Sequence, residues 1–297
     1  MRSPAISARR RARSTPRDAA GRQFQRPTIE RGIKRSLAER RAALEKLATP
    51  LRRKGLKVTV KIAWDYPAFE AIVRQVLRSK PDLVVAESRR RSIGARLFLT
   101  NTDWQLIRLC PAALLFIKGN RPWGKARVLA AIDPTHANAK PARLDGQILE
   151  SAQALAASQS GRLDVVHAYL PLAEYVPGIY GETIEMPVDP QIERQYERDL
   201  KRALDRCVAS IELPQRQLHL EVGAAHRVLP ALARRLRTDV LAMGAVSRRG
   251  LDRLFIGSTA ERVIDRVPCD VLVVKSRGFR TPVPRRALLP QVSLPPF

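Results

Sequence analysis

The sequence predicts an α/β fold built from two tandem copies of one doubly wound, parallel-sheet domain. Short apolar runs alternate with segments in which apolar residues recur at helical spacing. Strands that helices cover on both faces are apolar throughout, and the alternation is typical of parallel sheets. The chain also matches itself at an offset of 157 residues, and its 297 residues, 45% of them apolar, suffice for two cores.

The first copy is predicted to begin with a long basic helix. That helix ends at Gly55, because glycine readily adopts the left-handed conformation that closes a helix. KVTVKIAW then alternates apolar and polar residues as a strand does, and Asp82 precedes an all-apolar run. We expect helices at 29–54, 67–80 and 102–109, and strands at 57–64, 83–86 and 113–118.

The second copy is predicted to start after a linker, RPWGK, at 121–125. Its first strand, ARVLAAID, ends in Asp133, and a long insertion with Pro and Gly occupies 171–190. We expect strands at 126–133, 162–169, 218–223, 240–243 and 270–275, and helices at 143–160, 191–209, 227–237 and 259–267.

The two copies align without a gap over their second halves. Asp82-LVVA falls on Asp239-VLAM, and residues 98–118 fall on 255–275. Six aligned pairs are identical: Phe98/Phe255, Thr102/Thr259, Ile107/Ile264, Pro111/Pro268, Leu115/Leu272 and Lys118/Lys275.

The first copy is predicted to be degenerate and incomplete at its N-terminus. Asp133 precedes Asp239 by 106 residues, so the matching point before Asp82 would lie upstream of Met1. No segment in 1–50 resembles the strand ARVLAAID. Either the start of this domain is lost or misplaced, or the fold tolerates its loss. A missing central strand would be destabilising unless another chain supplied one.

The ends of the chain are predicted to be disordered. Residues 1–28 are rich in Arg and lack apolar periodicity, and residues 277–297 are rich in Pro. The domains are then expected at 29–120, degenerate and truncated, and at 125–276, complete. No run is long enough to span a membrane, and no secretory signal is recognisable. The three cysteines form no CxxC pair, which fits a cytoplasmic protein.

The net charge of +26 is concentrated near the N-terminus. Residues 1–57 contain 18 Lys/Arg and 4 Asp/Glu, so this arm would attract any polyanion. Only 5% of residues are aromatic, and no zinc-finger spacing, recognition helix or RNP-like set of aromatic residues is recognisable. We therefore expect nucleic acid to bind only non-specifically, through the basic arm.

The loop after strand 240–243 carries the candidate site. Gly244 follows the strand, and nine residues separate Ser247 from Gly257-Ser258, which open a helix through Thr259. A helix N-terminus offers unpaired N–H groups and partial positive charge, both suited to phosphate. Glycine lets phosphate oxygens approach the backbone, and three arginines lie nearby in sequence: Arg248, Arg249 and Arg253.

These residues resemble the universal stress protein family, in particular its tandem, E-type members, over about 29–275. The nucleotide motif of that family reads G-x2-G-x9-G-[S/T], and Ser247 replaces its second glycine here. The resemblance implies flavodoxin-like domains, with ATP or another adenine nucleotide bound by Asp133, Gly244, Ser247, Gly257, Ser258 and Thr259. It implies no metal except a Mg²⁺ that accompanies the nucleotide. Two such domains are expected to dock as an internal pseudo-dimer through strands 113–118 and 270–275, and a homodimer or a partner of the same family is a further expectation.

Structural explanations of the same residues stay open. Ser258-Thr259-Ala260-Glu261 fits a capping box with Ser258 as the N-cap, and Gly257 would then be a loop residue with an unusual φ. Asp133 before Pro134-Thr135 also fits a turn. The first copy has none of the motif glycines, so we expect it to bind no ATP. Its matching residues are Glu87, Arg90, Thr100 and Asn101.

No catalytic set is recognisable, so the protein is not expected to be an enzyme. HExxH, GxSxG and a Walker lysine are missing, and Cys and His show no metal spacing. His167 and His219 fall within strands and are expected to pack or to hydrogen-bond there. The favoured function is survival of stress such as starvation, oxidants or DNA damage, with the nucleotide as a switch or sensor. Two alternatives remain: an adaptor that binds a hydrophobic ligand or a protein partner without nucleotide, and a nucleic-acid-associated factor.

Overall fold

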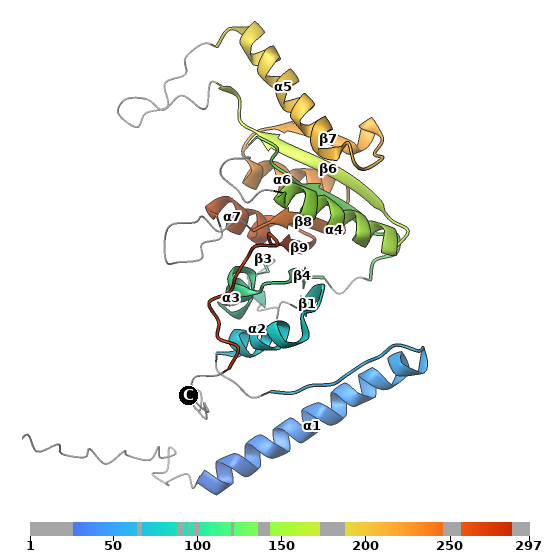
Figure 1. Cartoon of the computed structure of the whole chain (residues 1–297), viewed down its shortest axis with the longest axis vertical. Coiled ribbons are helices and arrows are strands. Elements are labelled where there is room, and N and C mark those ends of the chain that lie inside the picture. The colour runs from blue at the N-terminus through green and yellow to red at the C-terminus, as the bar shows by residue number, and fades with distance from the viewer. Residues whose placement is uncertain are drawn as a thin grey trace, which may run out of the picture. The chain divides into compact units, whose positions relative to one another are not determined.

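The computed structural model describes residues 26–63, 67–87, 92–93, 96–97, 101–119, 122–135, 143–172, 188–245 and 257–286. The chain divides into two compact units, 1–64 and 65–297, and each is described here by itself. Figure 1 labels the elements along the chain. Among the described residues, no helix is both long and apolar enough to cross a membrane.

The unit of residues 1–64 contains one long helix. Helix α1 (Arg26–Arg53) ends as expected at Gly55, whose φ is +85°. The N–H of Gly55 bonds to the Arg52 carbonyl, and the N–H of Leu56 bonds to the Leu51 carbonyl. These two bonds form a Schellman motif, which only a left-handed residue at Gly55 allows without strain.

The strand predicted at 57–64 is the clearest error of the sequence reading. Residues 57–63 form no strand, and Trp64 lies outside the described residues. A strand needs a hydrogen-bonded neighbour, and the alternating pattern alone does not supply one. The carbonyl of Val58 instead accepts a bond from the Arg52 guanidinium at 2.9 Å.

The unit of residues 65–297 is built on one seven-stranded sheet, in the order β1-β4-β9-β8-β5-β6-β7. All neighbouring strands are parallel except β4 and β9, which pair antiparallel with Leu115 opposite Leu272. The expected pairing of the two last strands is thus confirmed. The strands are β1 (Leu83–Glu87), β4 (Ala113–Ile117), β5 (Arg127–Ala131), β6 (Arg162–Tyr169), β7 (Leu218–Val222), β8 (Val240–Gly244) and β9 (Asp270–Val274), and a separate hairpin joins β2 (Ser92–Ile93) to β3 (Arg96–Leu97).

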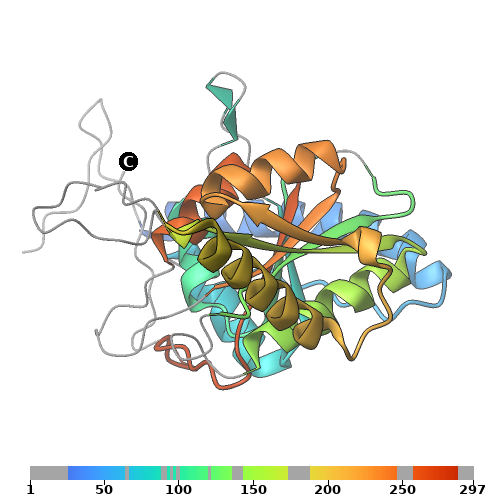
Figure 2. The ribbon, with the colours of Figure 1, turned by 90° about the horizontal axis from the view of Figure 1, so that it is seen from above.

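Helices cover both faces of the sheet, which confirms the doubly wound α/β fold (Figure 2). Helices α2, α3, α6 and α7 enclose one apolar core, and α4 and α5 enclose the other on the opposite face. The helices are α2 (Ala68–Ser79), α3 (Asn101–Leu109), α4 (Leu144–Ser158), α5 (Pro190–Val208), α6 (Ala225–Arg235) and α7 (Ser258–Arg266), with a short 3-10 helix, η2 (Gln215–Gln217), before β7.

The internal repeat is confirmed at the level of element boundaries. Adding 157 to the first residues of α2, β1, α3 and β4 gives the first residues of α6, β8, α7 and β9. Among the described residues, the first repeat (α2 to β4) contributes two strands to the large sheet and the second repeat (β5 to β9) contributes five. The two repeats therefore contribute unequal numbers of described strands to the sheet.

Two equivalent lysines join the repeats at the β4–β9 seam. The buried Lys118 ammonium donates to the carbonyls of Ile264 and Val267 at the end of α7. Lys275 donates to the Arg108 carbonyl at the end of α3, at 3.4 Å. Cations stabilise helix C-termini, so each repeat caps a helix of the other. Burial lowers the pKa of both lysines, that of Lys275 to about 8.

Candidate functional site

The candidate site lies at the carboxyl edge of the sheet, where β5 and β8 are neighbours. The two strands are parallel, with Ala131 opposite Met243. The helix after β5, α4, packs on one face of the sheet, and the helix after β8, α7, packs on the other. The strand order therefore reverses between β5 and β8, and in open α/β sheets such a switch point is where ligands bind.

Asp133 lies two residues beyond β5, with its side chain 44% exposed. Its carboxylate accepts a bond from the Thr135 hydroxyl at 2.9 Å, which is the local turn that the sequence suggested. Asp133 thus has a structural role, and it also presents an anionic, partly exposed group at the switch point.

Two neighbours of Asp133 were not identified as site residues from the sequence. The backbone N–H of Asp133 donates to the Asp145 carboxylate at 3.2 Å, so the first turn of α4 holds the end of β5. The buried His167 ring places Nδ1 3.2 Å from the Ile132 carbonyl and 3.8 Å from the Asp133 carboxylate. His167 packs and hydrogen-bonds within β6 as expected, but only the β5–β6 pairing brings it to Asp133.

Gly244 ends β8 and has a packing role that the sequence did not reveal. A Cβ at this position would lie 2.9 Å from Leu144 Cδ2 and 3.1 Å from Ile148 Cδ1. Glycine therefore lets the start of α4 pack closely on β8. The fold therefore needs glycine at position 244 whether or not a phosphate binds there.

Gly257 is the N-cap of α7, which corrects the capping box predicted with Ser258 in that role. Ser258 is already helical, and the Glu261 carboxylate bonds to Arg108 at 2.7 Å instead of turning back to the cap. Gly257 has φ −56° and ψ 141°, so the unusual φ suggested for it is also wrong. The predicted capping box does not form because Glu261 pairs with Arg108 of the first repeat instead.

The start of α7 is accessible. Gly257 and Thr259 are exposed, and no atom of the described residues lies within 4 Å of a Cβ placed at Gly257. Gly257 itself has no side chain with which to cap the helix, so its first N–H groups keep the capacity to bind an anion. Ser247 and the arginines at 248, 249 and 253 lie outside the described residues.

Positive charge gathers beside α7. Burial and three guanidinium groups lower the pKa of His226, which lies at the start of α6. The arginines that lower the pKa of His226 form a cationic surface, which suits a phosphate. The guanidinium groups belong to Arg262, Arg266 and Arg227.

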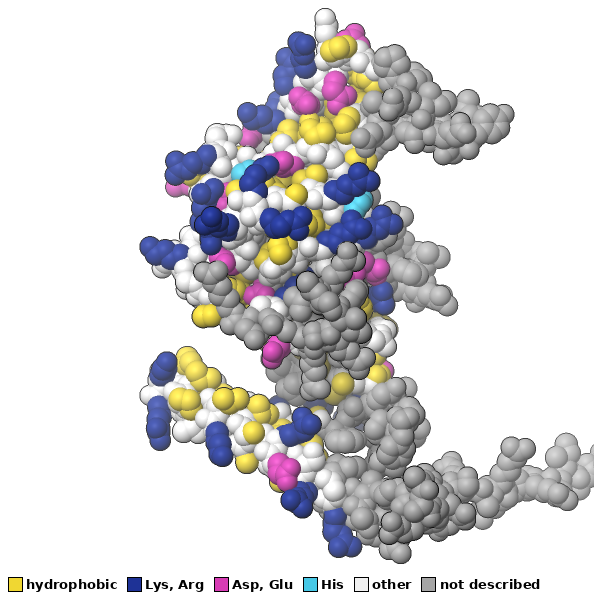
Figure 3. All heavy atoms as spheres, turned by 180° about the vertical axis from the view of Figure 1, so that it is seen from behind, with side chains coloured by type: hydrophobic (Ala, Val, Ile, Leu, Met, Phe, Trp, Pro, Cys, Tyr) yellow, Lys and Arg dark blue, Asp and Glu magenta, His cyan; other side chains and the backbone are white. Residues whose placement is uncertain are grey.

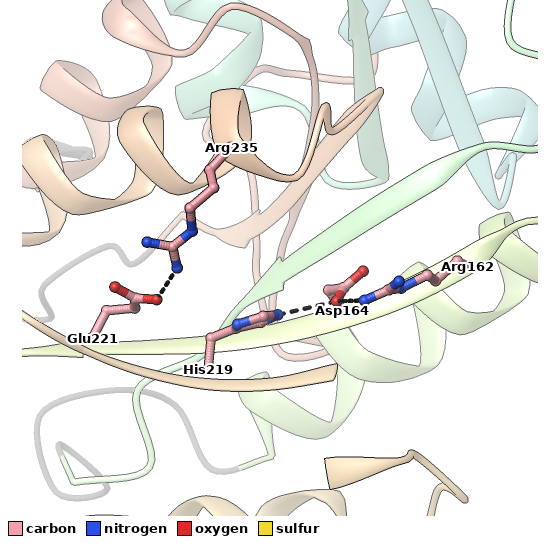
Figure 4. A network of polar contacts seen from close by, with 5 residues as sticks. All are labelled: Arg162, Asp164, His219, Glu221 and Arg235. Atoms are coloured by element: carbon pink, nitrogen blue, oxygen red, sulfur yellow. Dashed lines mark hydrogen bonds and ion pairs between the residues drawn. The ribbon is translucent and has the colours of Figure 1, made fainter. Parts of the chain in front are cut away.

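A second polar network crosses β6 and β7 (Figure 4). The buried Asp164 carboxylate accepts bonds from His219 at 3.0 Å and from Arg162 at 2.6 Å. Burial raises the pKa of Asp164, but the two hydrogen bonds outweigh it, so this pKa lies below its ordinary value. A second ion pair lies next to this network, between Arg235 of α6 and Glu221 of β7. Both acids are matched by cations, which is the signature of a structural network, and His219 behaves as predicted.

The described residues form no candidate metal site. No group of three or more His, Cys, Asp or Glu side chains lies close enough there to hold a metal ion. The described cysteines are free thiols, and Cys110 and Cys269 are buried.

The matching edge of the first repeat has different chemistry. Glu87, the equivalent of Gly244, is an exposed acid at the end of β1, and Asn101 begins α3 where Ser258 begins α7. Arg90 and Thr100 lie outside the described residues. Within the described part of the sheet, β1 has a neighbour on one side only, so no strand there corresponds to β5 and its Asp133.

Comparisons with known proteins agree with this architecture. A model of the universal stress protein family matches residues 13–118 and 127–275. Universal stress protein E of Escherichia coli K12 is 29% identical over 273 residues, which cover 87% of this chain and 80% of that protein. A functionally unknown protein from Pseudomonas aeruginosa PAO1 is 28% identical with a TM-score of 0.67, over 80% of this chain and 78% of that one.

A universal stress protein from Archaeoglobus fulgidus shares the fold at 19% identity, with a TM-score of 0.59 over 84% of this chain and 82% of that one. The family model matches both repeats and well over half of the residues. The chain therefore belongs to the universal stress protein family.

Proposed function

We propose that the second repeat binds an adenine nucleotide at the carboxyl edge between β5 and β8. The phosphates lie at the start of α7, against Gly257, Ser258 and Thr259. Asp133 meets the adenine, and Gly244 and Ser247 line the loop between them. The nucleotide acts in the cytoplasm as a switch or sensor that supports survival under stress, and Mg²⁺ enters only with the nucleotide.

The observation that carries this proposal is the glycine at 257. Its φ and ψ are accessible to any residue, and a Cβ there would meet none of the described residues within 4 Å. The described fold therefore does not require glycine at this position. A ligand does require it, because a missing side chain lets phosphate oxygens reach the N–H groups at the start of α7.

Nucleotide turnover is not part of the proposed function. The sequence has no Walker lysine, no GxSxG and no HExxH, so a recognisable nucleophile or metal base is missing. Binding itself would then carry the signal, through a nucleotide that favours one conformation of the loop between β8 and α7.

The test is a titration of the purified protein with a fluorescent ATP analogue. Gly257→Glu places a carboxylate where it competes with phosphate for the N–H groups and the helix dipole, and the open space at 257 accommodates it. We expect one saturable site per chain in the wild type and a loss of affinity of about tenfold or more in this variant. Asn101→Glu, at the start of α3, is the matched control and should bind like the wild type.

Two results would overturn the proposal. One is the lack of saturable binding by the wild type, and the other is equal binding by Gly257→Glu. Either result would favour the alternative, an adaptor that binds a protein partner or a hydrophobic ligand and no nucleotide.

A further inference from the structure

His167 is a buried histidine beside the apolar core between the sheet and helix α4. Its side chain is 3% exposed and lies on the same face of β6 as Leu163 and Val165, which belong to that core. His219 and His226 are partly exposed, and Figure 3 shows histidine side chains, in cyan, at the surface. Burying an imidazole costs free energy unless its polar atoms are bonded. The contacts that compensate for this cost lie at the end of β5.

The His167 ring contacts the two residues that follow β5. Its Nδ1 lies 3.2 Å from the Ile132 carbonyl oxygen and 3.8 Å from the Asp133 carboxylate. A carbonyl oxygen can only accept a hydrogen bond, so Nδ1 carries the hydrogen atom of this bond. The contact with the carboxylate is too long for a hydrogen bond and acts through the attraction between the N–H dipole and the negative charge.

Ile132 and Asp133 are fixed from two elements. The N–H of Ile132 donates to the Val166 carbonyl of β6 at 3.0 Å, and its own carbonyl accepts from His167. The N–H of Asp133 donates to the Asp145 carboxylate in the first turn of α4, at 3.2 Å. Strand β6 and helix α4 together therefore determine where the Asp133 carboxylate lies.

We propose that His167 is a positioning residue for the nucleotide, because it fixes the end of β5 and thereby the Asp133 carboxylate that meets the base. This inference rests on the proposed function, in which Asp133 meets the adenine. A carboxylate that is already held in place loses less conformational freedom when a ligand binds, so the affinity is higher. His167 acts through Asp133, and its own ring stays in the core.

The place of His167 in the sheet favours this role over packing alone. Leu163 and Val165 precede it on the same face of β6 and are apolar, and the polar residue comes only where β5 ends. Within the described part of the sheet, the first repeat contributes β1 and β4, which correspond to β8 and β9, and no counterpart of β5 or β6. His167 and Asp133 therefore come together in the repeat for which nucleotide binding is proposed.

The test is a titration of three full-length proteins with a fluorescent ATP analogue: the wild type, His167→Leu and His167→Asn. Leucine is apolar and removes the donor, whereas the asparagine amide retains an N–H donor close to the position of Nδ1. We expect His167→Leu to bind about tenfold more weakly, which is the scale of one lost hydrogen bond. His167→Asn should stay within about threefold of the wild type.

A double-mutant cycle shows whether His167 acts through Asp133. Asp133→Ala removes the carboxylate, so His167→Leu should change the remaining affinity by less than about twofold in that background. A purely structural role of His167 would weaken binding by the same factor in both backgrounds. Thermal unfolding establishes that each variant is folded. If His167→Leu does not fold, His167→Gln replaces it, because its amide lies one carbon further from the backbone than that of asparagine.

The outcomes separate this inference from the proposed function. Saturable binding by the wild type together with equal binding by His167→Leu would overturn the role of His167 and leave the proposed function standing. Equal factors in the two backgrounds would do the same. A wild type without saturable binding would overturn the proposed function, and the role of His167 with it.

Discussion

Strands β1 and β8 are the same element of two repeats, but their surroundings differ. Both span five residues and begin 157 positions apart. β8 lies between β9 and β5 and is buried almost throughout, whereas β1 lies at the edge of the sheet beside β4. Val85 of β1 is 61% exposed, and its counterpart Ala242 is completely buried. The comparison shows that the two repeats share the same backbone elements. The elements packed around each strand determine which side chains fit there.

The ends of these strands illustrate this point. Gly244 leaves room for α4, and the equivalent Glu87 has an exposed side chain at the edge of the sheet. The replacement of the motif glycine by glutamate in the first repeat therefore has a packing explanation. The predictions below test this asymmetry between the repeats, from the largest expected effect to the smallest.

Asp270→Ala should be the most damaging substitution. The buried Asp270 carboxylate accepts bonds from the N–H groups of Lys118 and Gly119 and from the Trp123 indole. Its counterpart in the first repeat is Ala113, which has no such role. We expect a loss of about 4 kcal/mol in the free energy of unfolding, because three donors lose their acceptor. Urea denaturation measures it.

The exposed Asp199 provides the control for that experiment. Its partners among the described residues, Arg202 and Gln195, lie on its own helix, so Asp199→Ala should cost no more than about 0.5 kcal/mol. Similar losses for the two aspartates would mean that the seam between the repeats contributes little stability.

Lys275→Met should change how stability depends on pH. The folded pKa of Lys275 is about 8, and its ordinary value is 10.5. Between these values the unfolded chain binds more protons, so the lysine's contribution to stability rises with pH in this window and is lost as pH falls through 8. Relative to the variant, the wild type should gain about 2 kcal/mol between pH 8 and pH 10.

Lys118→Met tests the same seam from the other repeat. Burial lowers the pKa of Lys118 as well, so the sign of the pH effect should be the same. Denaturation at both pH values, with each variant compared to the wild type, checks both lysines. A difference that stays constant with pH would contradict the buried position of these ammonium groups.

Gly244→Ala should have a smaller effect than the substitutions of Asp270, Lys275 and Lys118. The added methyl group would displace the ends of the Leu144 and Ile148 side chains, at a cost of about 1 kcal/mol. Glu87→Ala at the equivalent position should stay within about 0.5 kcal/mol, because Glu87 is exposed. Thermal unfolding measures both. Equal losses would show that α4 does not create the difference between the two strand ends.

Much of the fold could be predicted because the signals are local. Apolar runs, helical spacing and Gly55 gave element boundaries close to the observed ones, and the self-match identified the repeat. The strand at 57–64 failed because pairing depends on a neighbour that local alternation does not reveal.

The candidate site was harder to predict, because tertiary contacts decide what its residues do. The Glu261 pattern pointed to a capping box, but Arg108, 153 residues away, takes that carboxylate. The packing of Gly244 on α4 and the approach of His167 to Asp133 also depend on which strands are neighbours. Spacing along the chain identified the positions, and only the sheet order explains their surroundings.

The antiparallel pairing of β4 with β9 has a consequence for synthesis of the chain. β4 leaves the ribosome long before its partner, since roughly 150 residues separate the two strands. At translation rates of about 5–20 residues per second, the hydrogen-bonding edge of β4 stays unpaired for about 8–30 s. A nascent chain with a bare apolar edge is exposed to aggregation during this interval. The first repeat can therefore become complete only when translation reaches the last strand of the second, and a chaperone that shields β4 would act in that interval.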